Sequence, residues 1–250
     1  MLYIARVNLN GEFYMNLKSL DIVYIVKNTE YNGELRYSLR SVCKNFPHRN
    51  IWIVGNLPKG IKCDYFQPVR QFNNLDKYAN VRILMDAICS NKHISKNFIL
   101  FNDDFFILKP VKTLPVYCNG TLHQLIEYVQ RNANVINSKY IIKIQNMIND
   151  LTNHKMPCNN FELHIPIILN KQVIKDITKE YGRCHRSIYC NNIYDPDKCT
   201  SIKDVKIYQL DQIPTEDQTF VSTTEASFNM GAIGDYIREK FNEPCKYEYE

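Results

Sequence analysis

Two adjacent carboxylates and an amide interrupt an apolar run in the first half of the chain. Residues 97–108 read Asn-Phe-Ile-Leu-Phe-Asn-Asp-Asp-Phe-Phe-Ile-Leu, so the polar insert is Asn102, Asp103 and Asp104. The length and the Phe and Ile content of the run predict a buried strand. Because an ionised carboxylate is too costly to bury without a partner, we expect the insert where this strand leaves its sheet. Ligands of open α/β proteins bind at that edge.

Two anions at such an edge favour a cation as their partner. Ligation by oxygen alone suits Mg²⁺ or Mn²⁺, which also bridge substrate phosphates. Asp104 is the predicted direct metal ligand, and Asp103 could either bind the metal or accept hydrogen bonds from a ribose. The alternative is a strand followed by a solvated acidic turn, because short acidic triplets are common.

A helix predicted over residues 33–46 carries cationic side chains that could bind phosphate. Arg36, Arg40 and Lys44 recur every four residues and form a basic stripe on one side of it. Arginine matches phosphate with two parallel hydrogen bonds. The stripe could instead be a solvated helix face.

Two further cationic groups could contact a diphosphate. Lys77 and Asn80 open the next predicted helix, and a helix N-terminus attracts phosphate through its free amides and its dipole. Arg183, His185 and Arg186 lie within four residues and could clamp a diphosphate together.

Three residues are candidates for the general base. Glu162 and His164 are two residues apart and share a face if the segment is extended. His164 is also a candidate metal ligand, although a lone histidine is more often a structural hydrogen-bonding group. Asp195, in an Asp-Pro-Asp turn, is the third candidate. The sequence contains no nucleophile elbow, P-loop or G-x-G-x-x-G motif, which argues against serine hydrolases, P-loop enzymes and Rossmann dinucleotide enzymes.

The elements that must position these groups alternate between strand and helix up to about residue 110. Strands are predicted at 21–26 and 50–55 with the 33–46 helix between them, and a helix at 76–91 precedes the strand at 97–108. Strand-helix-strand units of this kind give parallel sheets with right-handed crossovers, so the pattern predicts a doubly wound α/β fold.

The second half of the chain is patterned differently. It is helical without a strand over 121–154, and shorter elements follow: a helix at 171–181, strands at 205–210 and 219–222, and a helix at 232–241. We therefore expect one catalytic domain. Its nucleotide-binding half is 1–115, a helical insertion is 116–160, and an acceptor-side part is 161–250.

Composition describes an ordinary globular protein. Of the 250 residues, 45% are hydrophobic and 23% charged, and the net charge of +5 fits an anionic substrate without demanding nucleic acid. Nine cysteines without a CxxC pair predict reduced thiols in a cytoplasmic protein. Arg6 and Glu12 interrupt any signal-peptide core, and no apolar stretch approaches the ~18 residues of a membrane span.

Four segments together resemble the Stealth proteins, which are sugar-phosphate transferases of microbial capsule synthesis related to the lysosomal-enzyme N-acetylglucosamine phosphotransferase. These segments are 34–41, 51–54, 101–105 and 164–166, in the order found in that family. The Stealth catalytic domain is similar to the GT-A fold of nucleotide-sugar glycosyltransferases. The Asn-Asp-Asp triplet resembles the DxD motif, which binds a divalent cation and the sugar-nucleotide diphosphate. The resemblance covers roughly residues 20–55, 75–110 and 160–190.

This resemblance implies a GT-A-like α/β fold: a mostly parallel, Rossmann-like sheet flanked by helices, with a helical insertion and a mixed C-terminal part. It implies that the strand end at 21–28, including Asn28, holds the base and ribose, and that Asp103 and Asp104 hold the metal diphosphate. His164 and residues 183–186 would close over the phosphates or the acceptor. The Trp-Val-Asp-Gly that usually follows the first strand of Stealth proteins is absent after Asn28.

The sequence thus favours a metal-dependent glycosyltransferase that moves a sugar from a nucleotide-diphosphate sugar to an acceptor hydroxyl. A UDP-sugar is the favoured donor, and the acceptor would be a glycan or a modified DNA base. The first alternative is a Stealth-type sugar-phosphate transferase. The second is a nucleotide- or glycan-binding module without catalysis, which Asn102 in place of the first DxD carboxylate would suit.

Overall fold

The computed structural model describes residues 15–132 and 138–249, which divide into two compact units. The sheet unit comprises Met15–Leu114, His164–Gln172 and Val205–Glu250, and the helical unit contains Pro115–Leu163 and Val173–Asp204. Arg6 and Glu12, on which the prediction of no signal peptide depends, lie outside the described residues. So do residues 133–137 of the predicted helical stretch.

The sheet unit is built on five strands in the order β3-β2-β1-β4-β7. Their bounds are β1 Asp21–Val26, β2 Ile51–Gly55, β3 Tyr65–Pro68, β4 Asn97–Asn102 and β7 Ile167–Asn170. The first four are parallel, and β7 runs antiparallel to β4. The predicted mostly parallel α/β sheet is therefore confirmed.

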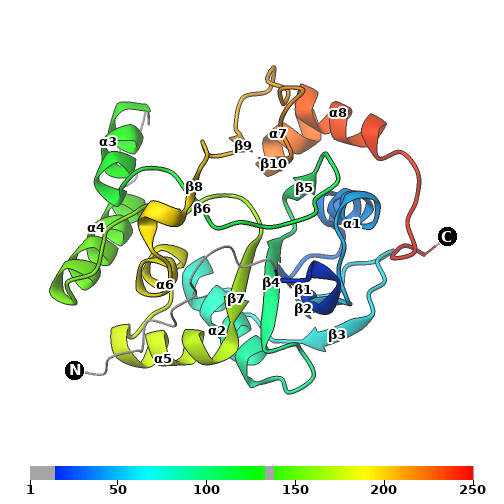
Figure 1. The fold of residues 1–250 in the computed structure, drawn as a ribbon. Helices are drawn as coiled ribbons and strands as arrows, with labels where there is room; N and C mark the ends of the chain where they lie inside the picture. Colours follow the sequence, from blue (N-terminus) through cyan, green and yellow to red (C-terminus); the bar gives the residue numbers. More distant parts are fainter. Residues whose placement is uncertain (1–14, 133–137, 250) are drawn as a thin grey trace. The chain divides into compact units, whose positions relative to one another are not determined.

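Two helices connect the parallel strands. Helix α1 (Gly33–Asn45) joins β1 to β2 and buries Leu35, Leu39 and Val42, the apolar positions at helical spacing. Helix α2 (Lys77–Ser90) joins β3 to β4. The two crossovers run in opposite directions along the sheet, so right-handed connections put α1 and α2 on opposite faces of it (Figure 1).

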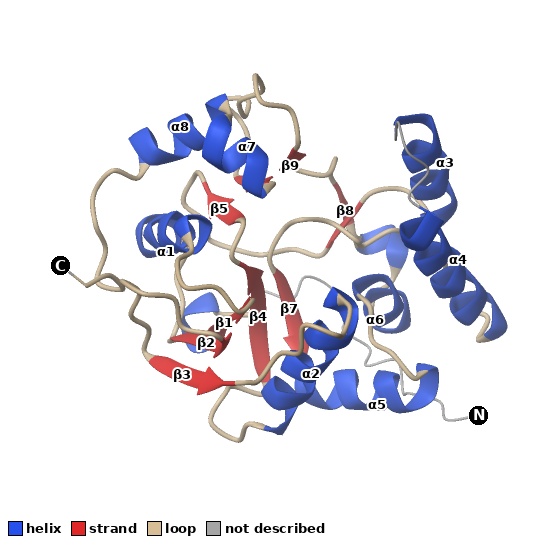
Figure 2. Ribbon diagram, turned by 180° about the vertical axis from the view of Figure 1, so that it is seen from behind, coloured by secondary structure: helices blue, strands red, loops and turns tan. Residues whose placement is uncertain are grey.

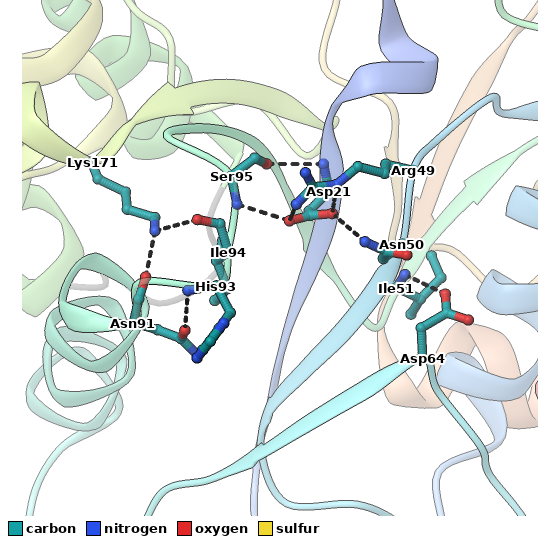
Figure 3. Close-up of polar contacts among 10 residues, drawn as sticks. All are labelled: Asp21, Arg49, Asn50, Ile51, Asp64, Asn91, His93, Ile94, Ser95 and Lys171. Atoms are coloured by element: carbon teal, nitrogen blue, oxygen red, sulfur yellow. Dashed lines mark hydrogen bonds and ion pairs between the residues drawn. The ribbon is translucent and has the colours of Figure 1, made fainter.

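A buried carboxylate ties the strands together at the N-terminal edge of this sheet. Asp21 is fully buried, and its two oxygens accept hydrogen bonds from Arg49 at 2.8 and 2.6 Å and from the Ser95 amide at 2.8 Å. Asn50 donates a further bond at 3.0 Å, as Figure 3 shows. These bonds join the beginning of β1 to the residues before β2 and β4.

The predicted single strand over 97–108 is divided in two. Strand β4 ends at Asn102, Asp103 and Asp104 form a turn, and β5 (Phe105–Ile107) belongs to another sheet. That sheet has the order β5-β10-β9, with β9 at Lys206–Ile207 and β10 at Phe220–Thr223. The division of the strand at Asp103 and Asp104 has a physical reason. The hydrogen-bond partners of the two carboxylates come from the N-cap of α1 and from β9 and β10, and not from the five-stranded sheet.

The small sheet packs against the last helices of the chain, α7 (Glu225–Met230) and α8 (Ala232–Lys240), as Figure 2 shows. Their contact is a hydrophobic cluster that includes Phe106, Leu108, Val221, Phe228, Ile233 and Ile237. Because β5 continues directly from the Asp103–Asp104 turn, this cluster fixes the far side of the turn.

The helical unit contains α3 (Leu122–Asn132), α4 (Ser138–Asn153), α6 (Arg186–Ile193) and most of α5 (Lys171–Tyr181). It also contains the two-stranded ladder of β6 (Tyr117–Cys118) and β8 (Thr200–Ser201). Short 3₁₀ helices lie at Leu17–Ser19 in the sheet unit and Pro196–Lys198 in the helical unit. In the part of the chain described here, no helix has the length and apolar character needed to cross a membrane.

Candidate active site

The order of the parallel strands creates a topological switch point between β1 and β4. From β1 the chain moves outward through β2 and β3, then returns to place β4 on the other side of β1. In open α/β sheets, ligands bind outside the carboxyl ends of the strands at such a point. The segments that leave the sheet there are residues 27–32 after β1 and Asn102–Asp104 after β4. The expectation that the two aspartates lie where a strand leaves the sheet is confirmed.

Asn32 joins the two segments across the switch point. It is the N-cap of α1, where its Oδ1 accepts a hydrogen bond from the Leu35 amide at 2.9 Å. The capping bond fixes the side-chain amide so that Nδ2 points to Asp103, donating to its Oδ2 at 2.6 Å. Burial raises the pKa of Asp103 and the charge of Asp104 raises it further, while the bond from Asn32 opposes the increase.

Asp104 is held from the small sheet. Lys206 on β9 and Ser222 on β10 are directly opposite each other, and both reach Asp104 Oδ2, the ammonium at 2.7 Å and the hydroxyl at 3.0 Å. The Lys206 and Asp104 side chains are only 15% and 13% exposed, so this ion pair is shielded from solvent. The other oxygen, Asp104 Oδ1, is buried without a hydrogen-bond partner. A buried carboxylate oxygen without a donor is uncommon and is accounted for by strain, a bound water or an ion.

A third carboxylate lies in the first turn of α1. Glu34 Oε1 accepts a hydrogen bond from Thr223 Oγ1 at 2.7 Å. Burial raises the pKa of Glu34 to about 7, and the charges of Asp103 and Asp104 contribute to the increase against the Thr223 bond and Lys206. The charges of both aspartates thus favour the protonated form of Glu34, which can bind a proton near neutral pH.

The raised pKa of Glu34 should make the free energy of unfolding depend on pH. Because the folded state binds this proton more tightly than the unfolded chain, the contribution of Glu34 is full below pH 4.5 and is lost as the pH rises to about 7. Glu34→Gln should therefore flatten the decline in the free energy of unfolding between pH 5 and 7.5, measured with urea in EDTA. The exposed Glu239→Gln serves as the control. A Glu34→Gln profile parallel to the wild-type profile would contradict this account.

The charges at the switch point are unbalanced. The Lys206 ammonium pairs with Asp104, and the charge of the exposed Lys27, which pairs with Glu225 at 3.5 Å, also acts on Asp103. The three carboxylates of Glu34, Asp103 and Asp104 share these two ammonium groups. A set of carboxylate oxygens with one oxygen unpartnered fits a hard divalent cation, which Asp103 and Asp104 would hold. Within the described residues, no three His, Cys, Asp or Glu side chains gather into a metal-binding group. Such a cation would therefore take further ligands from water and substrate phosphates, as Mg²⁺ commonly does.

Four other predicted residues belong to the sheet unit at this edge. Asn28 is exposed just after β1. Strand β7 pairs Ile167 with Leu100, a register that places His164 beside the end of β4. Lys77 is exposed at the start of α2, after β3 and two strands from the switch point. Asn80 bonds the backbone of Phe72 through both side-chain atoms, at 2.9 Å each, and so stabilises the preceding loop.

The basic stripe of α1, expected either to bind phosphate or to form a solvated helix face, is paired with a carboxylate at Arg36 and Arg40. Arg40 is 9% exposed, and it donates to both oxygens of Glu248 at 2.7 Å and to the carbonyls of Phe241 and Asn242. Arg36 also contacts Glu248, at 3.2 Å. The stripe is buried at Arg40 because the C-terminal segment of the chain passes over it. These arginines stabilise that segment.

Glu162 belongs to the helical unit and is held there by an ammonium group and a backbone amide. Its Oε2 lies 3.4 Å from the Lys143 ammonium, and its Oε1 accepts a hydrogen bond from the Ser187 amide at 2.9 Å, at the beginning of α6. Burial would raise its pKa, but Lys143, His185 and the Ser187 amide outweigh burial and lower the pKa to about 2. A carboxylate so stabilised as an anion is a weak base.

The cationic group at 183–186 does not converge on one point. Arg183 pairs with Asp150 at 3.0 Å, and Arg186 donates to the Leu163 carbonyl at 2.6 Å. Burial lowers the pKa of His185 to about 4, with Glu162 opposing the decrease. Asp195, also in the helical unit, caps the 3₁₀ helix at Pro196–Lys198 through the Asp197 amide.

Sequence reasoning missed the residues that hold the two aspartates. Asn32 carried a signal, since an Asn directly before a predicted helix is a typical N-cap. Lys206, Ser222 and Thr223 carried none, because their short strands are brought to the site by pairing across about half the chain.

The fold and the site together define a mixed α/β protein with a carboxylate-lined ligand edge at its switch point. No protein-family model matches the sequence, and no curated protein matches it. Among solved structures, the chain is similar to the glycosyltransferase GlyE of Streptococcus pneumoniae TIGR4, with 10% identity and a TM-score of 0.46 over 90% of this chain and 61% of that one. The apo form of GlyE is 10% identical, with a TM-score of 0.40 over 90% of this chain and 60% of that one. The chain thus spans about three-fifths of the length of these GlyE chains.

Proposed function

We propose that the protein is a cation-dependent glycosyltransferase that binds a nucleotide-diphosphate sugar at the switch point between β1 and β4. The observation that carries the proposal is the Asp103–Asp104 turn, with Asp104 Oδ1 buried and unpartnered at the carboxyl end of a parallel strand. The resemblance of Asn102-Asp103-Asp104 to a DxD motif supports this choice of substrate class. Mn²⁺ or Mg²⁺ is the proposed cofactor, held by Asp103 and Asp104.

Each residue at the site has a role in this proposal. A bound divalent cation would supply positive charge to balance the diphosphate leaving group. Asn32 orients Asp103, and Ser222 orients Asp104. Lys206 places a second positive charge beside the same edge. The exposed end of β1 at Asn28 would face the nucleoside.

The acceptor hydroxyl needs a base, and His164 is the proposed one among the three predicted candidates. Strand β7 begins three residues after His164 and pairs with β4, which supports this choice. Imidazole is a common general base in enzymes. Glu162 is stabilised as an anion, and Asp195 is engaged as a cap.

The products of a labelled UDP-sugar test the reaction type. Incubation with Mn²⁺ and candidate acceptors should release nucleoside diphosphate if the sugar alone is transferred. Release of nucleoside monophosphate would instead support the Stealth-type sugar-phosphate transfer. Turnover of neither kind across a panel of nucleotide sugars would contradict the proposal.

One observation favours a second candidate, a metal-free nucleotide- or glycan-binding module. The Lys206 ammonium already occupies Asp104 Oδ2, so it could serve as the permanent cation of the site.

Lys206→Met separates the two candidates. In a cation-dependent enzyme, Lys206 competes with Mn²⁺ for Asp104, so its removal should tighten Mn²⁺ binding about tenfold, equivalent to ~1.4 kcal/mol. Electron paramagnetic resonance measures free Mn²⁺ directly, and the exposed Lys203→Met provides the control. Unchanged Mn²⁺ affinity, together with lost binding of the nucleotide sugar in EDTA, would favour the binding module.

A further inference from the structure

A second polar region of the sheet unit lies at the other end of α1. A cavity of about 750 Å³ is formed by the end of that helix, the loop that follows it, and the segment after α8. Six cationic side chains are among those lining it: Lys18, Arg40, Lys44, Arg49, Lys240 and Lys246. Only one carboxylate, Glu243, lines it with them.

Two of the six cations are neutralised by buried carboxylates. Arg40 binds Glu248, and Arg49 binds Asp21, as Figure 3 shows for the second pair. Among the described residues, no carboxylate lies within ion-pair distance of the four lysines. The lining therefore keeps four ammonium groups against one carboxylate, an excess of positive charge.

The walls of the cavity are built before any ligand binds. Arg40 fixes the segment after α8 to α1 through Glu248 and two backbone carbonyls. His48 in the lining is bonded to the Phe46 carbonyl at 2.8 Å. Burial lowers the pKa of His48 against the bond to the Phe46 carbonyl and the charge of Asp64, and the Lys246 ammonium contributes to the decrease.

We propose that this cavity, the lysine cavity, binds a small compound carrying at least two phosphate charges. Its volume is within the range of small-molecule sites, about 300–1,000 Å³. Lysine binds phosphate as a point charge, and none of these four has a carboxylate partner among the described residues. Lys44, Lys240 and Lys246 lie over aromatic rings instead. Nucleic acid would instead favour a continuous basic stripe along one face.

The lysine cavity is distinct from the candidate active site. Helix α1 is capped at its beginning by Asn32, which binds Asp103, and its last turn contains Lys44. A helix of this length places its two ends about 20 Å apart. A phosphate compound in the cavity would therefore act as an accessory ligand, and this inference does not depend on the proposed transferase activity.

Calorimetric titration with inorganic pyrophosphate tests the proposal. It is done in EDTA, so that cation-dependent binding at Asp103 and Asp104 does not contribute. Wild type should bind one pyrophosphate, and Lys44→Gln/Lys246→Gln should weaken binding about tenfold. Lys92→Gln/Lys112→Gln removes two exposed lysines outside the cavity and should bind as wild type does. All four lysines are exposed, so both variants should fold.

Three results would overturn the proposal. Wild type could fail to bind millimolar pyrophosphate, or the two double variants could lose affinity equally. The third is tighter binding of a single-stranded oligonucleotide than of pyrophosphate, with the loss shared by both variants, which would assign the charge to a nucleic-acid surface.

Discussion

Asp104→Asn is expected to lower the proposed glycosyl transfer by about 10²–10³-fold, the scale for loss of a group that stabilises developing charge. The amide keeps the shape of the side chain and can still accept a bond from Ser222. It lacks the charge that pairs with Lys206 and that would hold a divalent cation. Mn²⁺ affinity should fall in parallel, because the unpartnered oxygen is the one available to a ligand. Turnover and Mn²⁺ binding are measured on the same preparation.

A matched variant separates this effect from a general loss of acidic charge. Asp86 is exposed on α2, so Asp86→Asn removes one carboxylate of the sheet unit without touching the switch point. It should retain wild-type turnover and Mn²⁺ affinity. If the Asp104→Asn variant has normal turnover and normal Mn²⁺ affinity, the metal site does not include Asp104.

The largest expected loss of stability comes from Arg40→Met. Arg40 and Glu248 have side chains only 9% and 4% exposed, and their closest contact is 2.7 Å. Removal of Arg40 leaves the buried Glu248 carboxylate with the longer contact to Arg36, and breaking a buried pair typically costs about 3–5 kcal/mol. Two backbone carbonyls also lose their donor. Urea unfolding measures the change.

Arg36→Met is the internal comparison, because Arg36 contacts the same carboxylate at 3.2 Å from a position 36% exposed. Solvent screens that pair, so its loss should cost below about 1 kcal/mol. Arg40→Met/Glu248→Met should recover part of the loss of the single variant, since no unpaired charge remains buried. Equal costs for Arg36→Met and Arg40→Met would show that burial does not strengthen the interaction.

Local sequence patterns predicted the elements that are periodic and buried. The β-branched run at 21–26 and the spacing of Leu35, Leu39 and Val42 correspond to β1 and α1. Strand β3 escaped prediction because it is largely exposed and lacks an apolar alternation. Strand β7 was not predicted, because it is short and begins directly after Pro166, where the sequence has the pattern of a loop.

The site could be predicted in part for the same reason. Asp103 and Asp104 stood out because charge interrupts an apolar run. Their partners did not, since Lys206 lies 102 residues from Asp104 in the sequence. The prediction for the basic stripe was wrong at Arg40. Its helical spacing is the same as that of an exposed face, but Glu248, 208 residues away, covers it. Ion pairs over such separations are set by tertiary pairing and leave no local pattern.

Thermal unfolding with nucleotide sugars is the most direct test of the central claim. Ligands that bind only the folded state raise its apparent stability. A panel that includes UDP-sugars, each with and without Mn²⁺, should contain at least one that stabilises the wild type only when Mn²⁺ is present. Asp103→Asn/Asp104→Asn should abolish that increase. If no nucleotide sugar gives Mn²⁺-dependent stabilisation, or the double variant retains it, the switch point between β1 and β4 is not a cation-dependent donor site.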